Sequence, residues 1–388
     1  MQGHAPAISS APLSLAMVAG ETSGDLLAGL LLEGVRARWP DAQAFGIGGP
    51  KMQEQGFDAW WPHEKLAVRG YIEVLRHYRE IVGIRRQLRT RLLAQPPRLF
   101  VGVDAPDFNL DLARDLKAQG IPCVQFVCPS IWAWRAHRVH RLRASVDHVL
   151  CLFPFEPELL RAAGVAATFV GHPLAQVIAR APSREAARAA LGLSASDTVL
   201  ALLPGSRASE IAHLAQRFVQ AAQLVAAERP GLRCVLPAIP SLRPAIEAAI
   251  AQAGGLPGLQ ILQGQSHLAL AACDVTLIAS GTATLEAALF ARPMVIAYHM
   301  HPLSWWIMQR KRLQPWVGLP NILAGEFLVP ERLQEAAHPK QLAHDVLAWL
   351  DDPARMQRVQ HQLAAQRQTL QLDTPELCVH AIEEVLAR

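Results

Sequence analysis

The chain has 388 residues, of which 51% are hydrophobic and 18% are charged, and its formal net charge is +4. This length exceeds one ordinary core and fits two domains, and the apolar content excludes a largely disordered chain. No apolar stretch reaches the roughly 18 residues that a membrane-spanning helix needs, and residues 1–14 do not resemble a signal peptide. The six cysteines show no paired spacing, which predicts reduced thiols in a cytosolic protein.

Apolar runs alternate with helical patterns along the chain. In the first half they lie near 13–19, 43–47, 98–103, 122–128, 146–152 and 167–170, and in the second half near 198–203, 232–237, 259–263, 274–279 and 293–297. Runs this continuous are typical of strands buried on both faces of a sheet. We therefore predict an α/β protein with two parallel sheets and crossover helices.

The domain boundaries follow from this alternation. We predict a first domain over 1–175, a second over 176–350 and a helical tail over 351–388, with a polar linker at 173–184. Residues 338–388 are predicted to be helical only, with breaks at Pro353 and Pro375. The tail packs either on the first domain or on a second subunit, so both a monomer and a homodimer are alternatives.

The first predicted strand leads into Ala-Gly-Glu-Thr-Ser-Gly-Asp at 19–25. Its glycines allow a tight turn and close backbone approach, and its polar side chains suit either helix capping or ligand binding. The candidate ligand contacts in this turn are Glu21, Ser23, Gly24 and Asp25.

Gly-Val-Asp-Ala-Pro-Asp-Phe-Asn at 102–109 follows another buried strand. Asp104 ends that strand, where partial desolvation would raise the pKa of its carboxyl toward that of a useful base. Asp107 follows Pro106 and is predicted to be a helix N-cap. We therefore predict that Asp104 acts as a catalytic base and that Asp107 caps the helix. The alternative is that both residues only cap the helix.

The segment from Pro129 to Arg143 combines aromatic and cationic side chains. Aromatic rings stack on sugars and guanidinium groups hold phosphate, which makes Trp132, Trp134 and Arg135 candidate ligand contacts. Nucleic-acid binding is the rival interpretation, but such surfaces usually belong to a more basic chain. We therefore predict no nucleic-acid partner.

Two short polar interruptions mark the second half of the chain, Leu-Pro-Gly-Ser-Arg at 203–207 and Ala-Ser-Gly-Thr-Ala-Thr-Leu-Glu at 279–286. Each follows a predicted strand and opens a helical pattern, so free N–H groups and a helix dipole are directed at one spot. This arrangement predicts a diphosphate held between two helix N-termini. The candidate residues are Gly205, Ser206, Arg207, Glu210, Ser280, Gly281, Thr282, Glu286 and, as a lesser candidate, Asn321.

Two segments combine apolar and basic residues. Residues 65–98 hold nine Lys/Arg against two acidic residues, and their start is apolar; residues 305–316 combine tryptophans with Arg310, Lys311 and Arg312. Such a composition suits the surface of an anionic membrane, although core packing explains either segment singly. The candidate membrane or acyl contacts are Leu66, Val68, Tyr71, Ile72 and Leu75.

Seven motifs occur in the order found in the lipid-A-disaccharide synthase family, which the chain therefore resembles over about 13–387. They are Ala-Gly-Glu-Thr-Ser-Gly-Asp, Gly-Val-Asp-Ala-Pro-Asp-Phe-Asn, Pro-Ser-Ile-Trp-Ala-Trp-Arg, Val-Gly-His-Pro, Leu-Leu-Pro-Gly-Ser-Arg, Ser-Gly-Thr-Ala-Thr-Leu-Glu and Leu-Pro-Asn-Ile-Leu-Ala-Gly. The resemblance implies the GT-B fold, with two Rossmann-like doubly wound domains facing a cleft.

The same resemblance implies an inverting, metal-independent glycosyltransferase without a cofactor. Its substrates would be UDP-2,3-diacylglucosamine and 2,3-diacylglucosamine 1-phosphate (lipid X), used in the cytoplasm at the anionic surface of the inner membrane. By motif, Asp104 matches the family's general base, and the UDP contacts match Ser206, Arg207, Glu286 and Asn321. The chain departs from the family pattern at Arg69 and Tyr71, which interrupt the apolar segment, and at Glu326, where a basic residue is expected.

Two rival functions remain as alternatives. A non-hydrolysing UDP-N-acetylglucosamine 2-epimerase would share the architecture but would not need the apolar segment 66–75. A membrane-associated nucleotide-sensing module without turnover would not need a carboxylate at Asp104.

Overall fold

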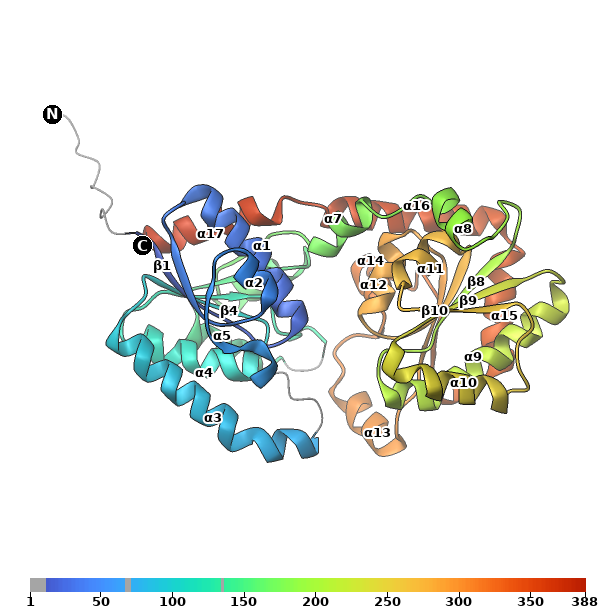
Figure 1. The fold of residues 1–388 in the computed structure, drawn as a ribbon, viewed down its shortest axis with the longest axis horizontal. Coiled ribbons are helices and arrows are strands. Elements are labelled where there is room, and N and C mark those ends of the chain that lie inside the picture. The colour runs from blue at the N-terminus through green and yellow to red at the C-terminus, as the bar shows by residue number, and fades with distance from the viewer. Residues whose placement is uncertain (1–11, 67–70, 134–135) are drawn as a thin grey trace. The chain divides into compact units, whose positions relative to one another are not determined.

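The computed structural model describes residues 12–66, 71–133 and 136–388, which form two compact units. Unit 1 contains the described residues up to 172 together with 372–388, and unit 2 contains 173–371. The chain therefore enters unit 2 at Pro173 and returns to unit 1 for its last helix. Figure 1 shows the elements of each unit.

Unit 1 is built on a seven-stranded parallel sheet with the order β3-β2-β1-β4-β5-β6-β7. Its strands are β1 (Ser14–Ala19), β2 (Gln43–Gly48), β3 (Asp58–Pro62), β4 (Leu99–Val103), β5 (Cys123–Phe126), β6 (His148–Cys151) and β7 (Ala167–Phe169). Its helices are α1 (Thr22–Arg38), α2 (Pro50–Glu54), α3 (Tyr71–Ala94), α4 (Pro106–Lys117), α5 (Arg138–Ser145), α6 (Glu156–Ala162) and α17 (Thr374–Leu386), with a 3₁₀ turn at His63–Lys65.

The sheet of unit 1 is covered on both faces, as the continuous apolar runs predict. Successive side chains of a strand point to opposite faces, so Leu15 and Met17 of β1 join one buried cluster with α1 and α17. Ala16 and Val18 join a second cluster with α3 and α4. The two helical layers lie on either side of the sheet in Figure 1.

Unit 2 contains a six-stranded parallel sheet with the order β10-β9-β8-β11-β12-β13. Its strands are β8 (Val199–Leu203), β9 (Arg233–Ala238), β10 (Leu259–Gln263), β11 (Val275–Ala279), β12 (Met294–Tyr298) and β13 (Glu331–Leu333). Its helices are α7 (Pro173–Ala179), α8 (Arg184–Ala190), α9 (Ala208–Glu228), α10 (Arg243–Gln252), α11 (Ser266–Ala272), α12 (Thr282–Leu289), α13 (Pro302–Lys311), α14 (Leu319–Ala324), α15 (Pro339–Leu350) and α16 (Pro353–Leu370), with 3₁₀ turns at Pro240–Leu242 and Gln334–Ala336.

The C-terminal helices divide between the units. Helix α16 packs on α12, α14 and α15 of unit 2, whereas α17 packs on α1 of unit 1. The helix breaks predicted at Pro353 and Pro375 lie at the starts of α16 and α17. The segment predicted as a linker, 173–184, begins at the boundary between the units and contains the whole of α7.

Both sheets place a topological switch point where neighbouring strands send their helices in opposite directions. In unit 1 this point lies between β1 and β4, and in unit 2 it lies between β8 and β11. Ligands of open α/β sheets bind beyond the carboxyl ends of the strands at such points. The turns at 20–25 and 104–109 therefore lie side by side in unit 1, and those at 204–207 and 280–282 do so in unit 2.

Candidate functional site

The turn after β8 brings Arg207 to the start of α9. Gly205 has φ +129°, and a side chain there would collide with Glu210, so this position requires glycine. The carboxylate of Glu210 accepts hydrogen bonds from the backbone N–H groups of Ser206 (2.8 Å) and Arg207 (3.1 Å) and pairs with the Arg207 guanidinium at 2.8 Å. Glu210 thus caps α9, while the side chain of Arg207 stays 71% exposed.

The turn after β11 opens α12 differently. Gly281 precedes the helix in an extended conformation, and no side chain from the described ranges caps the helix there. The first-turn residues Thr282 and Ala283 line a cavity, so the N–H groups at this helix start are available to an anion. The hydroxyl of Ser280 donates to the main-chain oxygen of Val317 at 3.3 Å.

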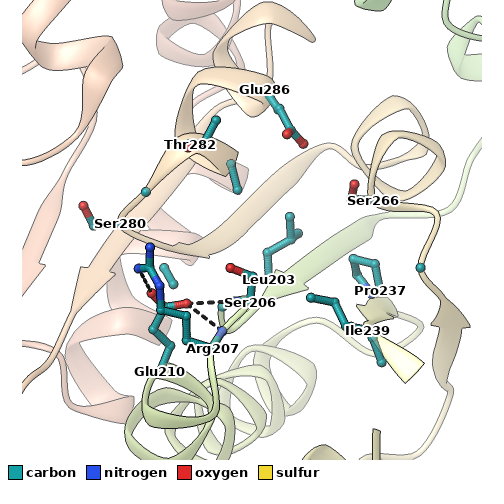
Figure 2. A pocket seen from close by; sticks show the side chains of 16 residues that line it. Leu203, Ser206, Arg207, Glu210, Pro237, Ile239, Ser266, Ser280, Thr282 and Glu286 are labelled. Carbon is teal, nitrogen blue, oxygen red and sulfur yellow. Dashed lines mark hydrogen bonds and ion pairs between the residues drawn. The ribbon is translucent and has the colours of Figure 1, made fainter. Parts of the chain in front are cut away.

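The two turns border one cavity of about 350 Å³ within unit 2. Figure 2 shows Ser280, Thr282 and Glu286 on one side and Arg207 with Glu210 on another. The loops after β9 and β10 complete the wall. The lining residues are Leu203, Gly205, Ser206, Arg207, Glu210, Pro237, Ala238, Ile239, Gly264, Ser266, Ala279, Ser280, Gly281, Thr282, Ala283 and Glu286.

The cavity wall combines apolar and polar groups. Leu203, Pro237 and Ile239 offer apolar contacts to a planar ring, while Arg207 and the start of α12 offer positive charge to an anion. The arrangement fits a nucleoside diphosphate. Sequence reasoning missed Pro237, which ends the strand predicted at 232–237, and Ile239, which follows that strand; their position at its carboxyl end was the available signal.

Glu286 lies one turn into α12 and belongs to the cavity wall. Its carboxylate is 3.5 Å from Nε2 of His267, and this contact raises the pKa of the imidazole above its usual value. The ring of Phe290 packs edge-on against His267. A carboxylate held in place this way can accept hydrogen bonds from two neighbouring hydroxyl groups of a ligand.

Asn321 is not among the residues that line the cavity, so its contact with the nucleotide stays a prediction. The side chain is fully buried. Its amide donates to the main-chain oxygen of Val329 and to Glu331, and its oxygen accepts from the N–H of Val329. The hydrogen-bonding groups of Asn321 are therefore already paired within the protein.

Asp104 follows β4 in unit 1 and has the environment expected of a base. Burial raises the pKa of its carboxyl, and the negative charge of Glu21 raises it further. Asp104 and Ala105 both have positive φ values, 50° and 38°. The strained turn is held by Asn109 and Gln125, whose amides donate to the main-chain oxygen of Asp104 at 2.9 Å and leave its carboxyl to other partners.

Two other carboxylates of unit 1 have structural partners. Asp25 is buried and accepts from the N–H groups of Gly49 (2.8 Å), Lys51 (2.9 Å) and Met52 (3.2 Å), so it caps α2, and its role as a ligand contact stays a prediction. Asp107 lies in the first turn of α4 rather than at its N-cap, which is Ala105.

The predicted Arg-rich segment is held by ion pairs to α4. Arg138 donates to Asp107 at 2.9 Å, and Arg141 donates to Asp111 at 2.7 Å.

In the turn after β1, Ser23 is exposed and Gly24 packs against Ala19. Ser23 is therefore open to a ligand, whereas the two arginines are already paired.

Trp132 belongs to an aromatic cluster beyond β5 and β6. Its ring contacts Phe153 and Phe155 edge-on, and its Nε1 donates to the buried carboxylate of Glu156 at 2.9 Å. Burial raises the pKa of Glu156 to about 7. Trp132 is thus fixed in orientation, and it is half-buried against the core of unit 1.

Several predicted contacts cannot be placed. Trp134, Arg135 and Val68 lie outside the described residues, as do the side chains of Tyr71, Ile72 and Leu75 in α3. Leu66 is described, and it packs against the core of unit 1.

Within the described residues no helix is both long and apolar enough to cross a bilayer. All six cysteines are buried and free.

The fold of the two doubly wound units indicates the class of protein. Known structures share this fold along nearly the whole chain. It is similar to a UDP-GlcNAc 2-epimerase from Neisseria meningitidis bound to UDP-GlcNAc (TM-score 0.63, 10% identity, 97% of this chain and 100% of that chain). It is also similar to MurG from Acinetobacter baumannii (TM-score 0.59, 14% identity, 97% and 100%). At these identities the likeness shows the fold alone, which is that of GT-B glycosyltransferases.

Sequence comparison identifies the family. Residues 15–382 match the lipid-A-disaccharide synthetase family. The chain is 63% identical over 379 residues to the lipid-A-disaccharide synthase of Albidiferax ferrireducens, covering 96% of this chain and 97% of that protein. It is 59% identical to that of Verminephrobacter eiseniae, covering 97% and 98%. The chain belongs to the lipid-A-disaccharide synthetase family and is a glycosyltransferase.

Proposed function

We propose that this enzyme joins UDP-2,3-diacylglucosamine to 2,3-diacylglucosamine 1-phosphate, forming the β-1,6-linked lipid A disaccharide 1-phosphate and UDP. The observation that carries the proposal is the match to one family of disaccharide synthases over 15–382. The cavity in unit 2 supports it, because its wall suits a nucleoside diphosphate. The epimerase neighbour shares only the fold, so it does not favour the rival reaction.

The donor nucleotide lies in the unit 2 cavity. Its diphosphate accepts hydrogen bonds from the first turn of α12 and from the guanidinium of Arg207, which can take two phosphate oxygens at once. Glu286 accepts from the ribose hydroxyls. Because Arg207 pairs with Glu210 in the structure, the diphosphate competes with that carboxylate for the same guanidinium.

Asp104 is the general base. Its carboxylate accepts the proton of the acceptor 6-hydroxyl as the oxygen forms a bond to the anomeric carbon, while the bond from that carbon to the UDP oxygen breaks on the opposite face. The configuration therefore inverts. Arg207 and the dipole of α12 stabilise the charge that develops on the leaving diphosphate. The acceptor is bound by unit 1, with its sugar stacked on Trp132.

Membrane association uses the apolar and basic surface of α13 and its neighbours. Trp306 is 50% exposed, Leu313 54% and Phe327 66%. The guanidinium of Arg310 lies 3.7 Å from the centre of the Trp306 ring. Exposed apolar groups beside cations suit an anionic lipid surface. The basic face of α3 contributes less, because Arg85 and Arg89 pair with acidic residues of α4.

The direct test is to incubate the enzyme with both diacyl sugars and anionic vesicles, then measure the disaccharide 1-phosphate and UDP by mass spectrometry. One UDP per disaccharide is the expected result. Formation of an epimer from UDP-N-acetylglucosamine alone would favour the rival enzyme, and binding of UDP without turnover would favour a sensing module.

The substitution Arg207→Ala should weaken UDP binding at least tenfold, since it removes a charge-assisted contact. Wild-type affinity for UDP in this variant would contradict the phosphate site.

A further inference from the structure

Glu331 lies at the start of the edge strand β13 and does not line the cavity. One carboxylate oxygen accepts from the N–H of Val317 at 2.9 Å, and the other accepts from the N–H of Gly318 at 2.9 Å and from Asn321 at 2.8 Å. Burial raises the pKa of this carboxyl, although the three donors oppose the shift. A buried carboxylate with three donors fixes the segment that supplies them.

That segment reaches the proposed nucleotide site in one further step. The main-chain oxygen of Val317 accepts from the hydroxyl of Ser280. The N–H of Ser280 donates in turn to the main-chain oxygen of Ala297 in β12 at 2.9 Å. Ser280 lines the cavity and directly precedes Gly281, so the hydroxyl contact anchors the turn that opens α12.

The residues around this contact are closely packed. A side chain at Gly318 would meet the terminal methyl group of Ile296, which would have to move to make room beside Glu331. The amide of Asn321 donates to the same carboxylate and to the main-chain oxygen of Val329, and its oxygen accepts from the N–H of Val329. The Leu-Pro-Asn-Ile-Leu-Ala-Gly motif therefore supports a loop and does not itself reach the cavity.

We infer that Glu331 is a positioning residue for the nucleotide site: by holding Val317 and Gly318, with Asn321 as its partner, it fixes Ser280 and the start of α12 in the geometry that receives the diphosphate. The inference rests on the proposed location of UDP. Its consequence is an effect on donor affinity from a residue that does not touch the donor.

The test substitutes Glu331→Gln, which has nearly the same shape. The glutamine oxygen can still accept from Gly318, but its NH₂ group would face the N–H of Val317 and release it. We expect UDP to bind about tenfold more weakly by calorimetry, with the KM for the donor raised similarly and the KM for the acceptor unchanged. Removing a negative charge would otherwise strengthen the binding of an anion, so the sign of the change separates positioning from simple electrostatics.

Two further variants make the result decisive. Asp345→Asn is the matched control, because Asp345 is a buried carboxylate of unit 2 that pairs with Arg332, the next residue of β13, and does not line the cavity. It should lower thermal stability while leaving UDP affinity unchanged. Ser280→Ala should weaken UDP binding, and its effect should not add to that of Glu331→Gln, since both break one chain of contacts.

Each outcome decides a different question. If wild-type protein does not bind UDP, the proposed function fails, whatever Glu331 does. If wild-type protein binds UDP and Glu331→Gln binds it equally well, only the positioning role fails. Equal weakening by Asp345→Asn, additive effects of Glu331→Gln and Ser280→Ala, or unchanged affinity in Ser280→Ala would also overturn the positioning role.

Discussion

Replacing Asp104 by asparagine tests the proposed chemistry with little structural disturbance. Asparagine tolerates positive φ, so the strained conformation of this residue (φ 50°) can persist. Asn109 and Gln125 bond to the main-chain oxygen, which the substitution leaves in place. The variant therefore loses a proton acceptor and little else.

The expected loss is a 10²–10⁴-fold fall in kcat, about 2.7–5.5 kcal/mol of transition-state stabilisation. The assay is UDP release under saturation with both sugars, with UDP affinity and thermal stability measured beside it. Because burial raises the pKa of Asp104 in the folded state, its ionisation opposes folding at neutral pH. The variant should therefore be at least as stable as wild type at pH 8. Near-normal turnover in a folded variant would refute the assignment.

The pH profile provides a second measurement on the same residue. Activity should fall as pH decreases through the raised pKa of Asp104, because the protonated carboxyl cannot accept a proton. Glu21→Gln removes the negative charge that contributes to the shift. The pKa of Asp104 should then decrease, and the acidic limb of the kcat profile should move to lower pH. An unmoved limb, or one displaced to higher pH, would contradict the electrostatic coupling.

Three further substitutions probe separate contacts. Glu286→Ala should weaken binding of UDP about tenfold but leave 2′,3′-dideoxy-UDP unaffected, and calorimetry showing equal losses would exclude a ribose contact. Trp132→Phe leaves Glu156 without its Nε1 donor, which should lower the free energy of unfolding in urea by about 1–3 kcal/mol. Because the pKa of the Glu156 carboxyl is about 7, this loss should be larger at pH 8 than at pH 6. A loss that does not depend on pH would contradict the role of this hydrogen bond. Gly46→Ala should cost at least about 2 kcal/mol, because Gly46 has φ +136° and its missing side chain faces a main-chain oxygen of β1; an unchanged unfolding midpoint would contradict this.

The interior strands were predictable because each is buried on both faces. Continuous apolar runs predict β1, β4, β8 and β11 within a residue or two of their observed bounds. These four strands flank the switch points, so the turns that follow them were also located from the sequence. The family comparison confirms the disaccharide-synthase interpretation, which rested on these turns together with three other motifs.

Two of the four edge strands, β3 and β13, were missed, whereas the runs at 167–170 and 259–263 predicted the edge strands β7 and β10. β3 (Asp58–Pro62) and β13 (Glu331–Leu333) carry charged or partly exposed residues and are short, so no apolar run identifies them. Helix α7 was missed because prolines and polar residues around it resemble a linker. The contacts of Glu331 depend on this unpredicted strand, which explains why the sequence suggested a ligand role for Asn321 and gave no signal for its partner.

The polar residues of the βα turns divide according to what the backbone leaves unsatisfied. A short carboxylate near a helix start meets unpaired N–H groups of its own chain before any ligand arrives, as Asp25 and Glu210 show. The carboxyl of Asp104 also meets a backbone N–H, that of Ala105, but burial and the charge of Glu21 still raise its pKa. Glu286 lies beyond the first three residues of α12. Within such turns, carboxylates beside the helix start are therefore poor predictors of ligand contacts, whereas a carboxylate a turn further along, or one in a strained bend, is a better one.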